Sequence, residues 1–289
     1  MSESSADAVN INEAKELPSF SVDADGLPSE EAIRAYERDG VVCLRGAFSK
    51  PWVDLLDEGM EAAITVPYPS EYAFTVAKPG EPGFFVDSLV WQRFEQFKRF
   101  AFDSPAPDIA QRIMRTKGLI FYFDAVFQKD LGTSRETPWH YDETYWPLTG
   151  TQSCNMWTAI DPVPKAAALN LVRGSHLWTT DYNPVPFGPE IIYPGLPDRP
   201  NPPAWHKQPG EHEVVYAELD RGDCLIFNFR THHYAPGNTL KQRRRTMSTH
   251  WAGDDITYDD KPYQTDPYYR GENLVHGGSI ECETFPRLR

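Results

Sequence analysis

The segment Leu119-Ile120-Phe121-Tyr122-Phe123 opens the part of the chain that decides the fold. From here on, short runs rich in aromatic and β-branched residues alternate with turns, a texture typical of strands. Further strands are expected over Trp139 to Trp146, Ser153 to Ile160, Ala168 to Val172, Glu213 to Leu219, Cys224 to Phe229 and Thr246 to Trp251. Many short strands after a helical opening predict a mainly β protein with flanking helices, arranged as a double-stranded β-helix or cupin-like jelly roll.

Helices are expected upstream of these strands. Ser29 is suited to cap a helix that Gly40 ends. Further helices are expected after Ser49, around Trp91 to Phe97, and around Ile109 to Ile113. Residues 1–18 are polar and acidic and predict a disordered N-terminal arm. Residues 19–289 are expected to form a single domain.

Composition excludes several classes of function. The chain has 289 residues, a formal net charge of -14 and a pI near 5.0, which argues against a nucleic-acid partner. No apolar run reaches the ~18 residues that a membrane span requires, and no secretory signal is recognised at the start. Four widely spaced cysteines without a C-x-x-C pair predict a reduced, cytoplasmic protein.

The segment Thr137-Pro-Trp-His-Tyr-Asp-Glu-Thr-Tyr-Trp146 carries a His-x-Asp pair at His140 and Asp142. Two such residues on an extended strand point to the same side. A second histidine from the pair His232-His233 would complete a face of two imidazoles and one carboxylate, which suits non-heme Fe(II). The motif alone is weak, because a His-x-Asp occurs by chance in many proteins.

Residues 180–210 form a proline-rich stretch inside the predicted domain. A loop of this length in a compact domain is usually a lid or a binding loop. A surface loop without a role in binding is the alternative.

Several motifs in a fixed order resemble the phytanoyl-CoA dioxygenase family of Fe(II)- and 2-oxoglutarate-dependent oxygenases. The resemblance runs from about Ser29 to Trp251. It is carried by Asp39-Gly40-Val41-Val42, Trp139 to Glu143, Trp157 to Asp161, Ala168 to Val172, Gly174-Ser175-His176, Gly222-Asp223, Phe227, His233, Asn238 and Arg244.

The resemblance implies that His140, Asp142 and His233 bind iron. His233 is preferred to His232 because the family has Asn five and Arg eleven residues after this ligand, where Asn238 and Arg244 stand. Arg244 would hold the distal carboxylate of 2-oxoglutarate through two parallel donors. Trp146 and Asn238 are the other residues expected at the cosubstrate, although Trp146 is equally suited to plain core.

Some residues depart from the family pattern, and others are expected to have no role in the site. Ala235 stands where the family commonly has a serine that helps to hold 2-oxoglutarate, and Thr246 could take over that role. Arg243 and Arg245 are expected to be surface charges. Glu143 is not expected to bind iron, and His250 is expected to be an ordinary core or surface histidine.

The resemblance implies a dioxygenase that uses Fe(II), 2-oxoglutarate and O2, releases succinate and CO2, and oxidises a C–H bond of a small-molecule substrate. Hydroxylation, desaturation, ring formation and endoperoxide formation all remain open. One alternative is a zinc- or manganese-dependent hydrolase or isomerase on the same barrel, because two His and one Asp also hold those ions. A degenerate binding protein without turnover is the other.

Overall fold

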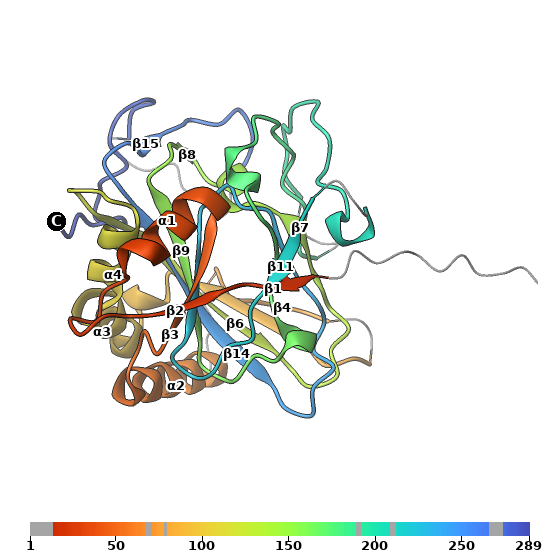
Figure 1. Ribbon diagram of the computed structural model, residues 1–289. Helices are drawn as coiled ribbons and strands as arrows, with labels where there is room; N and C mark the ends of the chain where they lie inside the picture. Colours follow the sequence, from red (N-terminus) through yellow and green to blue (C-terminus); the bar gives the residue numbers. More distant parts are fainter. Residues whose placement is uncertain (1–13, 67–70, 78–79, 189–191, 209–211, 266–273) are drawn as a thin grey trace, which may run out of the picture.

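The protein is described here by a computed structural model that covers residues 14–66, 71–77, 80–188, 192–208, 212–265 and 274–289. Two β-sheets face each other, and the helices gather on one side of the molecule (Figure 1). The predicted fold class, mainly β with flanking helices in a jelly-roll arrangement, is confirmed.

Within the described residues the larger sheet has eight strands in the order β2-β3-β12-β9-β14-β6-β5-β4. Their bounds are β2 Ser19–Ser21, β3 Val41–Arg45, β4 Phe74–Val76, β5 Phe84–Ser88, β6 Ile120–Lys129, β9 Ser153–Ala159, β12 Cys224–Phe227 and β14 Arg244–Ala252. The smaller sheet has the order β1-β11-β10-β13-β7. It consists of β1 Lys15–Glu16, β7 Thr137–His140, β10 Asn170–Val172, β11 Val214–Tyr216 and β13 His233–Ala235. A small pair joins β8 Leu148–Thr149 to β15 Thr257–Tyr258.

The α-helices pack on the outer face of the larger sheet and form the main hydrophobic core with it. They are α1 Glu30–Asp39, α2 Lys50–Thr65, α3 Glu95–Asp103 and α4 Ala106–Ile113. Short 3-10 helices cover Val90–Gln92, Asp142–Tyr145, Lys165–Ala167, Ser175–Leu177 and Trp205–Lys207. Helix α1 begins and ends as expected: the Ser29 hydroxyl accepts from Ala32 N, and Gly40 ends the helix with φ 72°. A Cβ at Gly40 would collide with His176 and Thr231, so glycine is required by space as well as by conformation.

Strand β14 lies in the middle of the larger sheet, between β6 and β9. Successive side chains of a strand point to opposite faces. Met247 and Trp251 therefore join the core under the helices, whereas Arg244, Ser248 and His250 line the cavity between the two sheets. This alternation places β14 at the boundary between the core and the candidate site.

Two expectations for the local structure are wrong in part. The N-terminal arm was expected to reach residue 18, but Lys15–Glu16 pair with Val215 and Tyr216, and Leu17 is buried. Residues 1–13 lie outside the described residues. The strand expected over Trp139 to Trp146 ends at His140, and a 3-10 turn begins at Asp142. The chain leaves the sheet there because Glu143 N donates to Phe229 O instead of a strand neighbour.

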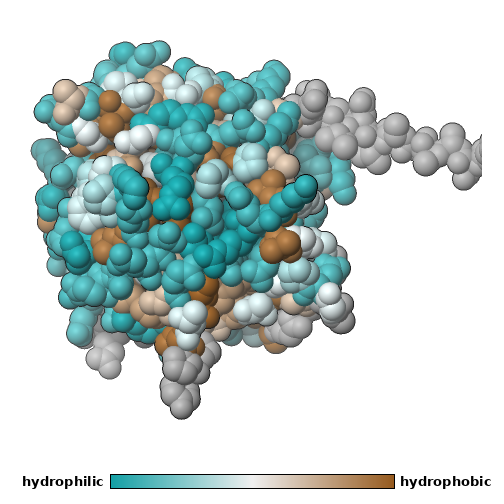
Figure 2. Space-filling model, turned by 90° about the horizontal axis from the view of Figure 1, so that it is seen from below, coloured by the Kyte–Doolittle hydropathy of each residue, from teal (hydrophilic) through white to brown (hydrophobic). Residues whose placement is uncertain are grey.

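The face shown in Figure 2 is mostly hydrophilic, with hydrophobic residues scattered over it. Among the described residues, no helix has both the length and the apolar content needed to cross a bilayer. The cavity between the two sheets is the place where a ligand would bind.

Candidate metal centre and cosubstrate pocket

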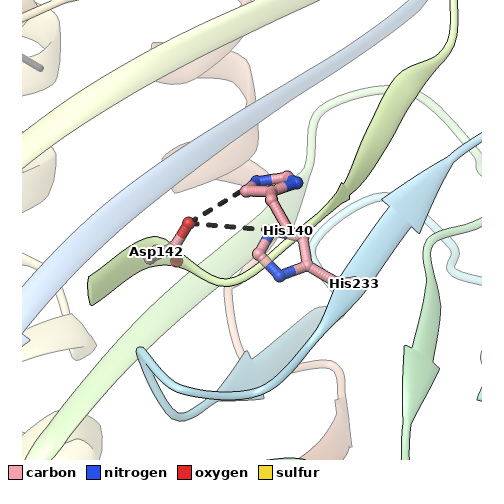
Figure 3. Close-up of side chains that lie close together, drawn as sticks. All are labelled: His140, Asp142 and His233. Atoms are coloured by element: carbon pink, nitrogen blue, oxygen red, sulfur yellow. Dashed lines mark ion pairs between the residues drawn. The ribbon is translucent and has the colours of Figure 1, made fainter. Parts of the chain in front are cut away.

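His140 and His233 meet because β7 and β13 pair with these two residues directly opposite each other. Asp142 joins them from the 3-10 turn that follows β7, and both imidazoles point toward its carboxylate (Figure 3). Asp142 Oδ1 lies 3.8 Å from His140 Nε2 and 3.7 Å from His233 Nε2. One ligand atom from each residue falls within 4.8 Å of the others. Two imidazoles and a carboxylate in this arrangement suit a divalent metal, and Fe(II) in particular.

Backbone carbonyls fix the tautomer of both histidines. His140 Nδ1 lies 2.7 Å from Pro138 O, and His233 Nδ1 lies 3.0 Å from Thr231 O. A carbonyl only accepts, so each Nδ1 carries the proton and each Nε2 presents a lone pair. Burial, together with the neighbouring His233, lowers the pKa of His140 well below its usual value. This ring is therefore neutral and ready to bind a metal.

Asn155 orients the carboxylate of Asp142. This asparagine lies on β9, and its Nδ2 donates to Asp142 Oδ2 over 3.0 Å, which leaves Oδ1 facing the histidines. Burial raises the pKa of Asp142, while His233 and the Asn155 amide oppose that rise. A bound cation would favour the ionised carboxylate further.

A cavity between the sheets contains His140, Asp142 and His233, called the metal-binding trio below because together they could hold a metal ion. It holds about 900 Å³ of empty space when its open mouth is counted. Aromatic side chains form most of its wall, among them Phe123, Phe127, Tyr145, Trp146, Phe187 and Tyr193. A mostly apolar lining with a few polar groups is typical of small-molecule sites.

Arg244 lies in the same cavity with its charge unpaired. Its side chain is 2% exposed, Nη1 donates to Ala167 O over 3.0 Å, and the guanidinium lies over the Trp157 ring. The Nε atom is buried without a partner, and no described carboxylate forms an ion pair with this residue. Burial lowers the pKa of Arg244 to about 10. A buried guanidinium without an anion is costly, so the site fits an anionic group that is supplied by a ligand.

The two other residues expected at the cosubstrate lie in different places. Trp146 lines the cavity, edge-on to Phe123 and His250. Asn238 is fully buried, and its Nδ2 donates to the backbone carbonyls of Lys129 and Gln242. Its Oδ1 accepts from Leu240 N, so both ends of the amide close the loop that leads into β14.

His232 points away from His233, as expected for neighbours on a strand. Its Nδ1 accepts from Trp205 Nε1 at 3.2 Å, and aromatic rings surround it. Glu143 also turns away from the metal-binding trio and forms a 2.8 Å ion pair with Arg230.

The expectation that Arg245 is a surface charge is wrong. Its side chain is 5% exposed and contacts Asp57 and Glu61 of α2 as well as Asp161. Arg243 also pairs with Glu61, but its side chain is 40% exposed. No local pattern around Arg245 predicts that α2 brings two carboxylates over this end of β14.

Two described residues of the proline-rich stretch contribute to the wall of the cavity. Phe187 and Tyr193 line the cavity wall, and the Phe187 ring lies 4.9 Å from that of His140. Hydroxyl groups of the metal-binding segment hold the stretch in place. The Thr144 hydroxyl donates to Tyr182 O, and the Tyr145 hydroxyl both donates to Val185 O and accepts from Val185 N. Residues 189–191 and 209–211 lie outside the described part.

Several polar residues of the cavity were not predicted from the sequence, among them Asn155, Ser248 and His250. The signal that could have found the latter two is the strand period, because both lie at even spacing from Arg244. Asn155 gave no such signal, since its role depends on contact with a distant turn.

Comparisons with known proteins agree with this geometry. Residues 36–246 match the family model described as phytanoyl-CoA dioxygenase. Among solved structures, the non-heme alpha ketoglutarate dependent carbocyclase SnoK from nogalamycin biosynthesis is similar, with a TM-score of 0.69 and 21% identity over 90% of this chain and 96% of that one. The epimerase SnoN, in complex with Fe3+, alpha ketoglutarate and nogalamycin RO, has a TM-score of 0.68 and 22% identity over 90% and 98%. EctD from S. alaskensis, with 2-oxoglutarate and 5-hydroxyectoine, has a TM-score of 0.65 and 16% identity over 86% of each chain.

No curated protein sequence gives a significant match. The family model nevertheless covers well over half of the chain and includes the metal-binding trio and Arg244. The protein therefore belongs to the phytanoyl-CoA dioxygenase family.

Proposed function

We propose that the protein is an Fe(II)- and 2-oxoglutarate-dependent dioxygenase that hydroxylates, or otherwise oxidises at a C–H bond, a small-molecule metabolite. Succinate and CO2 are the coproducts. Family membership supports the reaction class. The small molecules present in two similar structures, nogalamycin RO and 5-hydroxyectoine, support the class of substrate.

In this proposal His140, Asp142 and His233 hold the iron, and Asn155 keeps the carboxylate of Asp142 in place. Bound iron and 2-oxoglutarate together supply the activation of O2. The contribution of the chain is to present two imidazoles with Nε2 turned toward the metal, to position the substrate against the metal and to exclude water. The aromatic wall and the proline-rich stretch serve the last task.

The single observation that carries the proposal is the unpaired Arg244 in the cavity of the metal-binding trio. A 2-oxoglutarate that chelates the metal through its oxoacid end would present its distal carboxylate to this guanidinium. Thr246 supports the same role: it follows Arg244 by two positions, and its Oγ1 is buried without a partner among the described residues. It could replace the hydroxyl that Ala235 lacks. We assign Trp146 to the cavity wall and Asn238 to an indirect role, closing the loop before Arg244.

Two other functions fit less well. A zinc- or manganese-dependent hydrolase or isomerase would use the same three ligands but has no general need for a buried, unpaired guanidinium. A binding protein without turnover would not need Asn155 to hold Asp142 in a metal-ready position. A cytoplasmic location remains part of the proposal, supported by the four widely spaced cysteines, for which no disulfide is formed among the described residues.

The test is an anaerobic titration of the metal-free protein with Fe(II) and 2-oxoglutarate, followed by exposure to O2. We expect the weak visible charge-transfer band of the chelate, and then succinate release. Succinate is measured with and without candidate metabolites. Zn(II)-supported turnover of a metabolite without any oxoacid would favour the hydrolase instead.

A further inference from the structure

His250 is a third histidine of the cavity, outside the metal-binding trio. It lies on β14 opposite Asn155 of β9, so the two side chains point to the same face of the sheet. Both line the cavity. The close cluster of ligand atoms found among the described residues comprises only His140, Asp142 and His233. His250 therefore stands beside the metal-binding trio without being a member of it.

The orientation of the His250 ring is fixed. Nδ1 lies 3.0 Å from Phe123 O, so Nδ1 carries the proton. The ring stacks on Phe123 with 4.2 Å between centroids and meets Trp146 edge-on at 4.8 Å. Burial lowers the pKa of His250 to about 3, so the ring is neutral. Nε2 consequently offers a lone pair, and no described residue donates a hydrogen bond to it.

A polar acceptor inside an apolar wall costs about 1–3 kcal/mol if nothing donates to it. Here the surrounding wall is aromatic. Ser248, two positions earlier on the same face, is another polar group for which no hydrogen bond to a described residue is found. A substrate with a hydroxyl group would form a hydrogen bond with each of them. The substrate hydroxyl would donate to His250 Nε2, and the Ser248 hydroxyl would donate to the substrate oxygen.

The cavity also restricts the charge of the substrate. Among the described lining residues, Asp142 and Arg244 are the only ones with a carboxylate, an ammonium or a guanidinium. Under the proposed function both are already engaged, by the metal and by 2-oxoglutarate. A charged substrate group would be buried without a partner, at a cost of several kcal/mol.

We propose that His250 is a specificity-determining residue that accepts a hydrogen bond from a hydroxyl group of an uncharged, largely apolar substrate held against the aromatic wall. This inference rests on the proposed function, because it takes the metal and Arg244 as occupied. It adds the substrate class and the residue that recognises it.

The experiment uses full-length protein loaded with Zn(II) and 2-oxoglutarate, which is diamagnetic and does not turn over. Calorimetry first measures the binding of Zn(II) and 2-oxoglutarate. Failure at this step would contradict the proposed function itself. The loaded protein is then titrated with three matched probes: 2-naphthol, 2-methoxynaphthalene and 2-naphthoate. A tricyclic pair, 9-phenanthrol and its methyl ether, repeats the test in a larger size.

We expect the hydroxylated probes to bind about 10-fold more tightly than their methyl ethers, the value of one hydrogen bond, and naphthoate to bind more weakly still. His250→Phe keeps the ring shape and should remove the preference for the hydroxyl. His250→Gln offers a carbonyl oxygen and should restore part of it. Both variants should bind Zn(II) and 2-oxoglutarate like the unchanged protein.

A second readout is independent of affinity. In protein labelled with 15N-histidine, the His250 signals, identified by their loss in His250→Phe, should show a neutral ring with the proton on Nδ1. The Nε2 signal should shift with 2-naphthol but not with its ether. The inference is overturned if hydroxylated probes and ethers bind equally, if naphthoate binds best, if no probe binds to the loaded protein, or if Nε2 carries a proton.

Discussion

Arg244 and Arg245 are neighbours on β14, and their guanidinium groups lie in opposite environments. Arg245 points under α2 and is paired with Asp57, Glu61 and Asp161. Arg244 points into the cavity and has a backbone carbonyl, an aromatic ring and no described carboxylate. One face of the strand has its charges balanced within the fold, whereas the other leaves a charge to be balanced by a ligand. The difference indicates that the cavity face was shaped for binding, at some expense of stability.

The largest effect is expected for a similar contrast between His232 and its neighbour His233, the first residue of β13. His233→Ala should abolish iron binding, because it removes one of three ligands. His232→Ala should retain iron and lower only the free energy of unfolding, by about 1–3 kcal/mol, since Trp205 Nε1 loses its acceptor. Metal content after anaerobic reconstitution and desalting distinguishes the two. Iron loss in His232→Ala with retention in His233→Ala would reverse the assignment.

Substitution of Arg244 should change the affinity for 2-oxoglutarate, whereas substitution of Arg245 should change the stability of the fold. Arg244→Met should weaken 2-oxoglutarate binding about 100-fold, because a charge-assisted contact is lost. It should leave stability unchanged or raised, since an unpaired buried charge is removed. Arg245→Met should keep the 2-oxoglutarate affinity and lower the free energy of unfolding by about 2–4 kcal/mol, as Asp161 loses its partner. Calorimetric titration and urea unfolding measure both quantities. Equal losses of affinity in the two variants would contradict the contrast.

Acid should also distinguish the two faces. Burial lowers the pKa of His250 on the cavity face to about 3, from the 6.5 that is usual for a histidine in water. Unfolding therefore takes up a proton below pH 6.5, and stability is lost as the pH falls from 6.5 toward 3. The full loss is about 5 kcal/mol. His250→Phe should flatten the pH dependence of the free energy of unfolding over this window. An unchanged slope would show that His250 is already solvated in the folded protein.

The smallest effect is expected at Asn155, which acts on the metal through Asp142. Asn155→Ala should weaken iron binding about 10- to 100-fold, the usual effect of losing a residue that orients a ligand. Asn155→Asp is the matched variant of the same shape, and it should be worse because a second carboxylate would face Asp142. Iron affinity, measured by competition with a chelator, checks this order. If Asn155→Ala bound iron normally, the 3.0 Å contact would have no role in holding the metal.

Much of the site could be predicted from sequence because its ligands are tied to motifs. His140 and Asp142 lie two apart, and Asn238 and Arg244 lie at fixed offsets from His233. The choice of His233 over His232 agrees with the geometry. The fold class followed from the spacing of the strands, which depends on local pattern.

The remaining features depend on contacts that no local pattern encodes. Arg245 is buried because α2, almost two hundred residues earlier, supplies Asp57 and Glu61. Asp142 lies in a 3-10 turn because its neighbour Glu143 bonds to Phe229 O across the fold. His250 reaches the cavity by the strand period, but its significance comes from Phe123 and Trp146 around it.

The hydroxyl groups that hold the proline-rich stretch have one more consequence. Thr144 and Tyr145 bond to the backbone of Tyr182 and Val185, and both belong to the single turn that carries Asp142. Any movement of the chain at Tyr182 and Val185 would break these bonds and so disturb the turn. Movement of this part of the proline-rich stretch is thus mechanically coupled to the position of Asp142. A mutation at Tyr182 or Val185 would therefore change the geometry of the metal site.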